Sequence, residues 1–95
     1  MKDLSVSLLL DVYGVLLNEK QYRIAVDYYN EDLSLSEISE NENMTRQAAH
    51  DTLKRTVQLL NGYEEKLGYL KTVNSLKKAA EKEDIKSIYN IIENL

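Results

Sequence analysis

The sequence has no cysteine, proline, tryptophan or phenylalanine, and only three of its 95 residues are glycine. Without cysteine the chain can form no disulfide, thiolate nucleophile or cysteine-bound zinc site. Its single histidine excludes any site that needs two imidazoles. A glycine-rich phosphate loop and a supported Ser/His/Asp arrangement are also missing. We therefore predict a protein that is not an enzyme, with no catalytic residues, cofactor or metal.

Long hydrophobic runs are missing as well. The run of Leu8, Leu9 and Leu10 is soon followed by Asp11, far short of the roughly 20 apolar residues that a membrane span needs. Asp3 is unfavourable in the basic segment that begins a signal peptide. We expect a cytoplasmic protein without membrane insertion.

What the chain does have favours helices. Few helix-breaking residues and many Leu, Ile, Lys, Glu and Ala favour helix over sheet, and apolar residues recur at helical spacing almost throughout. We predict an all-α protein of five or six helices. The expected segments are 4–17, 19 to about 29, 35 to about 41, one that starts after Thr45, and 84–95; the expected caps are Asn18, Ser34, Thr45 and Asp84.

The helix that follows Thr45 has no clear end. Its apolar residues continue past position 60 at near-heptad spacing, while Gly62 and Gly68 each weaken a helix by up to about 1 kcal/mol. Residues 45–80 could therefore form one long helix, or two helices that meet at either glycine.

Residues 34–55 carry the most informative motif. Ser34 and Glu37 form a capping box, Asn43 suits the left-handed turn that follows, and Thr45 caps the next helix. A short helix, a tight turn and a second capped helix are the layout of a helix-turn-helix. The inward residues are expected to be Ile38, Met44, Ala48, Ala49 and Leu53, and the nucleic-acid-binding residues Thr45, Arg46, Gln47, His50, Lys54 and Arg55.

The outward residue types suit contact with DNA. Arg46 can pair with guanine and Gln47 with adenine through two parallel hydrogen bonds. Lys54 and Arg55 are better placed for phosphates. Asp51 is unfavourable near phosphate but could accept a hydrogen bond from a cytosine amine.

The chain resembles the DNA-contacting region four of bacterial sigma factors and, more closely, the YlxM family of small bacterial helix-turn-helix proteins. The runs that carry the resemblance are LNEKQYR at 17–23, YY at 28–29, LSLSEISE at 33–40 and TRQAAHDTLKR at 45–55. It implies a helix-turn-helix core without a wing and a helical tail. It also implies a gene beside those of the signal recognition particle, and a product suspected of regulating or contacting that particle.

Three positions depart from the usual pattern of the family. Glu42 stands where a buried apolar residue is common, and Ala49 where valine is common. Both changes imply looser packing around the turn. Arg23 is one place later than the usual Gln-Arg pair, which weakens a role for that segment in contacting the DNA backbone.

The charge distribution favours a second interpretation. Residues 1–45 carry three basic and nine acidic side chains, a net charge of −6, and residues 46–95 carry nine basic and seven acidic ones, a net charge of +2. The total of −4 is unlike a uniformly basic nucleic-acid binder. The alternative function is a protein- or RNA-interaction module associated with the signal recognition particle, without sequence-specific DNA binding.

We divide the chain into a helix-turn-helix domain at 1–60 and a helical extension at 61–95. Most of the seven tyrosines are expected to pack in the core, since no Phe or Trp fills it. One apolar seam is larger than a single tail helix can cover, so we expect a homodimer through the extension. The seam consists of Leu60, Tyr63, Leu67, Leu70, Val73 and Leu76.

Overall fold

The computed structural model describes residues 4–95 as an all-helical chain, as the sequence predicts. Asp3, on which the expectation about a signal peptide rests, lies outside these residues. Within the described part there is no strand, and no helix combines the length and apolar character needed to cross a bilayer. The elements are α1 (Leu4–Tyr13), the 3-10 turn η1 (Gly14–Leu16), α2 (Glu19–Tyr29), α3 (Leu35–Asn41), α4 (Arg46–Leu67), α5 (Tyr69–Glu81) and α6 (Ile85–Glu93).

All four predicted caps are present. The side chains of Asn18, Ser34 and Thr45 each accept a hydrogen bond from the backbone N–H three residues later, and Asp84 does the same for α6. At Asn18 and Ser34 the partner side chain also accepts from the cap's own N–H, which completes a capping box. Local side-chain hydrogen bonds thus set where four of the helices begin.

The first helix is shorter than predicted. We expected one helix over 4–17, but α1 ends at Tyr13 and a single 3-10 turn follows. Leu17 is then extended, because the chain must turn before α2 begins at Glu19. The turn leaves Val15 and Leu16 exposed instead of buried.

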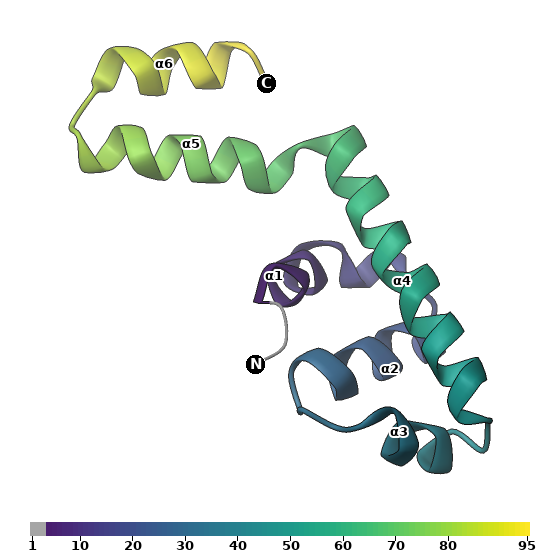
Figure 1. Ribbon diagram of the computed structural model, residues 1–95. Helices are drawn as coiled ribbons and strands as arrows, with labels where there is room; N and C mark the ends of the chain where they lie inside the picture. Colours follow the sequence, from purple (N-terminus) through teal and green to yellow (C-terminus); the bar gives the residue numbers. More distant parts are fainter. Residues whose placement is uncertain (1–3) are drawn as a thin grey trace.

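Helices α1, α2 and α3 pack around α4 and form a lobe of residues 4–67 (Figure 1). Ile24, Ile38, Ala49 and Leu60 are completely buried at its centre. The expected inward residues of the motif are confirmed, with Ile38, Ala49 and Leu53 buried and Met44 and Ala48 half-buried.

Most of the tyrosines pack in the core, as expected. Tyr13 is buried, and Tyr28, Tyr29 and Tyr63 pack against the core. The other three, Tyr22, Tyr69 and Tyr89, are exposed. Helical periodicity alone does not distinguish a core-facing tyrosine from one on a second apolar face that this chain leaves uncovered.

Residues 45–80 form two helices, and the interruption between them lies at Gly68. Helix α4 passes through Gly62, runs beyond residue 60 and ends at Leu67. Gly68 adopts the left-handed conformation, with a φ of 63°, and α5 starts at the next residue. Helices α5 and α6 then form an antiparallel hairpin that projects from the lobe (Figure 1).

This break makes the predicted dimerisation seam wrong as a continuous surface. Leu60 is completely buried in the lobe, and the ring of Tyr63 packs on that of Tyr13 with 6.1 Å between centroids. Leu70 is half-buried against the same core. Of the seam's residues within α4, only Leu67 is exposed, because the heptad spacing continues through a helix that the lobe itself covers.

Candidate nucleic-acid interface

Helices α3 and α4 are joined by a tight turn with Asn43 at its centre. Asn43 is left-handed, with a φ of 53°. Its N–H donates to the carbonyl of Glu40, and the N–H of Met44 donates to that of Ser39 over 2.9 Å. These two bonds are the Schellman pattern, which satisfies the last carbonyls of a helix and reverses the chain. Thr45 can therefore begin α4 directly after the turn.

The structure leaves the predicted contact residues exposed. Arg46, Gln47 and His50 lie in the first two turns of α4, and Lys54 and Arg55 lie in the next. Thr45 is exposed too, but its Oγ1 accepts a hydrogen bond from the N–H of Ala48 over 3.0 Å. In a helix-turn-helix, the N-terminal residues of the second helix contact base edges. The exposed start of α4 has the side chains and the position that this contact needs.

Asp51 contacts both Gln47 and His50 on this face of α4. Gln47 Nε2 donates a hydrogen bond to Asp51 Oδ1 over 3.0 Å, and His50 Nδ1 lies 3.4 Å from the same oxygen. The carboxylate therefore holds the Gln47 amide through one of its two N–H groups, and the carbonyl oxygen of that amide is not used in this bond. It also adds a negative charge where phosphate would approach.

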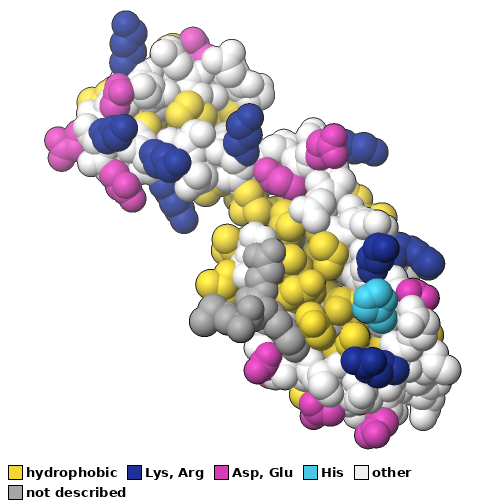
Figure 2. Space-filling model, in the orientation of Figure 1, with side chains coloured by type: hydrophobic (Ala, Val, Ile, Leu, Met, Phe, Trp, Pro, Cys, Tyr) yellow, Lys and Arg dark blue, Asp and Glu magenta, His cyan; other side chains and the backbone are white. Residues whose placement is uncertain are grey.

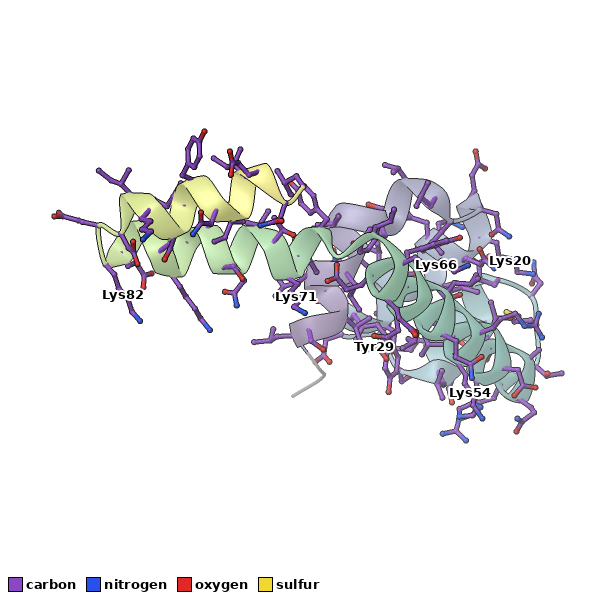
Figure 3. All side chains as sticks on the ribbon, turned by 90° about the horizontal axis from the view of Figure 1, so that it is seen from above. Lys20, Tyr29, Lys54, Lys66, Lys71 and Lys82 are labelled. Carbon is purple, nitrogen blue, oxygen red and sulfur yellow. The ribbon has the colours of Figure 1, made fainter. Side chains whose placement is uncertain are left out.

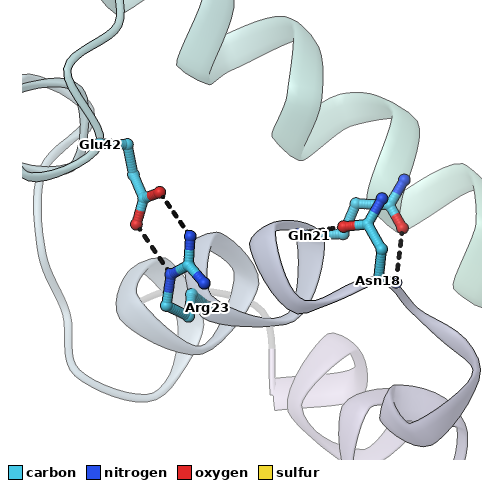
Figure 4. Close-up of polar contacts among 4 residues, drawn as sticks. All are labelled: Asn18, Gln21, Arg23 and Glu42. Atoms are coloured by element: carbon cyan, nitrogen blue, oxygen red, sulfur yellow. Dashed lines mark hydrogen bonds and ion pairs between the residues drawn. The ribbon is translucent and has the colours of Figure 1, made fainter.

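The turn is held from behind by Arg23 of α2 (Figure 4). Arg23 Nη2 and Nε donate to the two carboxylate oxygens of Glu42 over 2.8 and 3.1 Å. Glu42 is 11% exposed, and the hydrogen bond from Arg23 lowers the pKa of its carboxyl. The two-pronged pair is stronger and more directional than a single ionic contact. Glu42 thus replaces the expected apolar residue with an ion pair rather than with loose packing.

The pKa of Asp27, which lies near this ion pair, is raised. Burial is the main cause, and the nearby charges of Glu42 and Glu31 add to it. Arg23 compensates only part of this acidic density. Negative charge is therefore concentrated on the side of the lobe behind the turn.

The basic side chains of residues 4–95 are spread over both the lobe and the hairpin. Figure 2 shows Lys and Arg side chains and the histidine along α4, and acidic side chains gathered over α3. Seen from above, Lys54 lies on a different side of the lobe from Lys20 and Lys66, and Lys71 and Lys82 lie on the hairpin (Figure 3). The cationic surface that one copy can offer to a groove is thus small.

Sequence reasoning missed two of these polar contacts. Gln47 and Asp51 are four residues apart in a helix, so their spacing could have revealed the hydrogen bond. Arg23 and Glu42 are 19 residues apart, and no local pattern connects them. Among residues 4–95, no three His, Asp or Glu side chains gather as a metal site would require.

A short capped helix, a tight left-handed turn and a second helix with exposed first turns define a helix-turn-helix protein in an all-helical lobe. The chain belongs to the family described as "Putative helix-turn-helix protein, YlxM / p13 like", whose model matches residues 1–94. That is a helix-turn-helix family and not an enzyme family.

Relatives called "UPF0122 protein" are similar to this chain. One from Desulforamulus reducens is 60% identical over 63 residues, 66% of this chain and 54% of that protein. One from Clostridium perfringens is 44% identical over 90 residues, which are 95% of this chain and 79% of the relative. One from Fusobacterium nucleatum is 44% identical over 91 residues, 92% of this chain and 88% of the relative. The match thus spans about half of the first relative's length and most of the other two.

Proposed function

We propose that this protein binds DNA through the start of α4 and acts in transcription regulation in the cytoplasm. The observation that carries the proposal is the exposure of Arg46 and Gln47 in the first turn of α4, directly after the turn. Both side chains can form paired hydrogen bonds with a base edge in the major groove. The Schellman turn and the Arg23–Glu42 pair support it, since they hold the start of α4 in a defined position against α2 and α3.

The contact residues divide into two roles. Arg46 and Gln47 read bases, with Thr45 and His50 beside them. Lys54 and Arg55 lie further along the helix and contact phosphates, which fix the register on the duplex without reading sequence. Two copies would double this small basic surface, and dimeric helix-turn-helix proteins place their recognition helices on two half-sites about one DNA turn apart.

The test begins with selection of bound sequences from a random double-stranded DNA pool. Affinity for the selected site is then measured at several salt concentrations. Arg46→Ala and Gln47→Ala should each cost about 1–3 kcal/mol at the selected site and broaden the sequence preference. Lys54→Ala and Arg55→Ala should weaken binding to all sequences alike and lower the salt slope by about one.

Lys82→Ala is the matched control, because it removes an exposed cation from the far end of the hairpin. It should leave both affinity and preference unchanged. Selection of no sequence from the pool would contradict DNA recognition, and equal behaviour of all four α4 variants would contradict the assigned roles.

A second function is favoured by the acidic character of the chain. Its net charge is −4, Asp51 lies within the contact face, and acidic side chains surround α3. Here the fold serves as an interaction module for a protein or an RNA, with components of the signal recognition particle as partners. Capture from lysate with and without DNase separates the two functions, because protein and RNA partners of the module would survive DNase.

A further inference from the structure

Helices α5 and α6 bury very little of their apolar surface. Ala79 is the only buried residue of α5, and α6 has none. Ile88 and Ile91 of α6 are half-buried in the hairpin. Short helices in water depend on tertiary packing of an apolar face, because their own hydrogen bonds barely offset the conformational entropy lost. The hairpin therefore has an apolar surface that is suited to packing against a further protein element.

One unused surface is the outer stripe of α6, formed by Ile85, Tyr89 and Ile92. These residues are spaced at i, i+4 and i+7, so they lie on one side of the helix. They are 80%, 62% and 53% exposed. The stripe lies on the outside of a helix and is therefore convex. No charged residue interrupts it, so it forms an apolar ridge.

The second unused surface is a groove of about 560 Å³ between η1 and the start of α5. None of its lining residues carries a charge. Its walls include Val15 and Leu16 on one side and Leu67, Tyr69 and Val73 on the other. Leu95 lines it as well, so the groove continues into the end of the α6 segment.

Most of the protein's exposed apolar surface lies on these two features. Eleven large apolar side chains are exposed among residues 4–95, and eight of them belong to the groove or to the outer stripe with Leu95. Together these eight expose on the order of 1,000 Å², against about 800 Å² that each partner buries in a standard stable interface.

We propose that two copies of the chain associate by seating the outer stripe of each α6 in the groove of the other. A two-fold dimer needs a surface that is complementary to itself, and here the convex and the concave parts lie on one chain. Both parts are uncharged, so they offer no electrostatic attraction to an acidic peptide or to a nucleic acid. The interface leaves the exposed first turns of α4 outside it.

The test is the mass in solution by light scattering at about 100 μM, without nucleic acid, so its outcome does not depend on the proposed DNA binding. The full chain should have about twice its 11.0 kDa mass. Tyr89→Glu in the stripe and Leu16→Lys in the groove should each give monomers, because each places an unpaired charge in an apolar interface. Leu4→Lys changes an exposed leucine outside both features and should remain dimeric.

An equal mixture of the two single variants provides the decisive arm. The glutamate stripe of one variant meets the lysine groove of the other, and the second contact of that pair is unchanged, so the mixture should return to the dimer mass. A variant that failed to fold would not be rescued in this way. A monomeric wild-type chain would overturn the proposal, as would dimeric Leu16→Lys beside monomeric Tyr89→Glu, or a mixture that stays monomeric.

Discussion

At the scale of single residues, Asp51 has two opposing effects on the candidate interface. Its carboxylate holds Gln47 through a 3.0 Å hydrogen bond and lies beside His50, which reduces the number of orientations that the reading side chains can adopt. Its charge also opposes phosphate. A helix that only had to bind DNA tightly would bind better without the charge of Asp51. We therefore expect Asp51 to contribute to sequence preference instead of affinity.

The two effects of Asp51 can be separated by two substitutions. Asp51→Asn keeps an oxygen for Gln47 and removes the charge, so affinity should rise about two- to five-fold with the sequence preference retained. Asp51→Ala also removes the acceptor, so the preference at the base read by Gln47 should broaden. Both are measured on the selected DNA site. Glu65→Gln, an exposed carboxylate further along α4, is the control; if it raises affinity as much as Asp51→Asn, the effect is one of net charge alone.

At the scale of the elements, two glycines in the same region have opposite roles. Gly62 lies inside α4, and a Cβ built there meets no atom within 4 Å. Gly68 has a φ of 63°, a conformation that costs an L-residue roughly 1–2 kcal/mol. The first is a tolerated weakness in a helix, and the second makes the break between α4 and α5 possible.

Alanine at these glycines should change the free energy of unfolding in opposite directions. Gly62→Ala should stabilise the protein by about 0.5–1 kcal/mol, because glycine loses more backbone entropy than alanine in a helix. Gly68→Ala should destabilise it by about 1 kcal/mol, because the left-handed conformation must be kept. Urea unfolding measures both. A loss of stability in both variants would mean that Gly62 is needed for something other than helix formation.

At the scale of the whole molecule, Glu64 connects the lobe to the hairpin. Tyr13 Oη donates to its Oε1 over 2.6 Å, and the N–H groups of Leu70 and Lys71 donate to its two oxygens over 3.0 and 3.2 Å. Gly68 has no side chain with which to cap α5, so Glu64 takes this role from the last turns of α4. One carboxylate thus ties α1, α4 and α5 together across the break.

The Glu64 contacts should make stability depend on pH. The hydrogen bond from Tyr13 is the main cause that lowers the pKa of Glu64 below its ordinary value of 4.5. A lowered pKa contributes stability above pH 4.5 that is lost as the pH falls through the lowered value. Glu64→Gln should therefore be less stable than the wild type at pH 7, and the difference should shrink as the pH falls below 4.5. Urea unfolding at pH 7, 5, 4 and 3 tests this. If the difference in the free energy of unfolding between the variant and the wild type stays constant across the series, ionisation of Glu64 is not its cause.

Most of the secondary structure follows from local interactions. Ser34 with Glu37, Asn18 with Gln21, and Thr45 each satisfy backbone groups within three residues, so the start of every such helix can be read from neighbours in sequence. The exposed positions of Arg46 and Gln47 follow from the helical spacing of the apolar residues in α4. The pairing of Arg23 with Glu42 could not be predicted, because it joins residues that only packing of α2 against the turn brings together.

The sequence by itself determined the all-helical class, four helix starts with their caps, the helix-turn-helix and the residues exposed at the start of α4, because spacing and capping act over three or four residues. Only the tertiary structure decided which apolar face the lobe covers. Leu60 and Tyr63 have the same spacing as Leu67, yet packing of α1 against α4 buries Leu60, half-buries Tyr63 and leaves Leu67 exposed. Periodicity marks a face as apolar, but the element that covers it lies elsewhere in the chain.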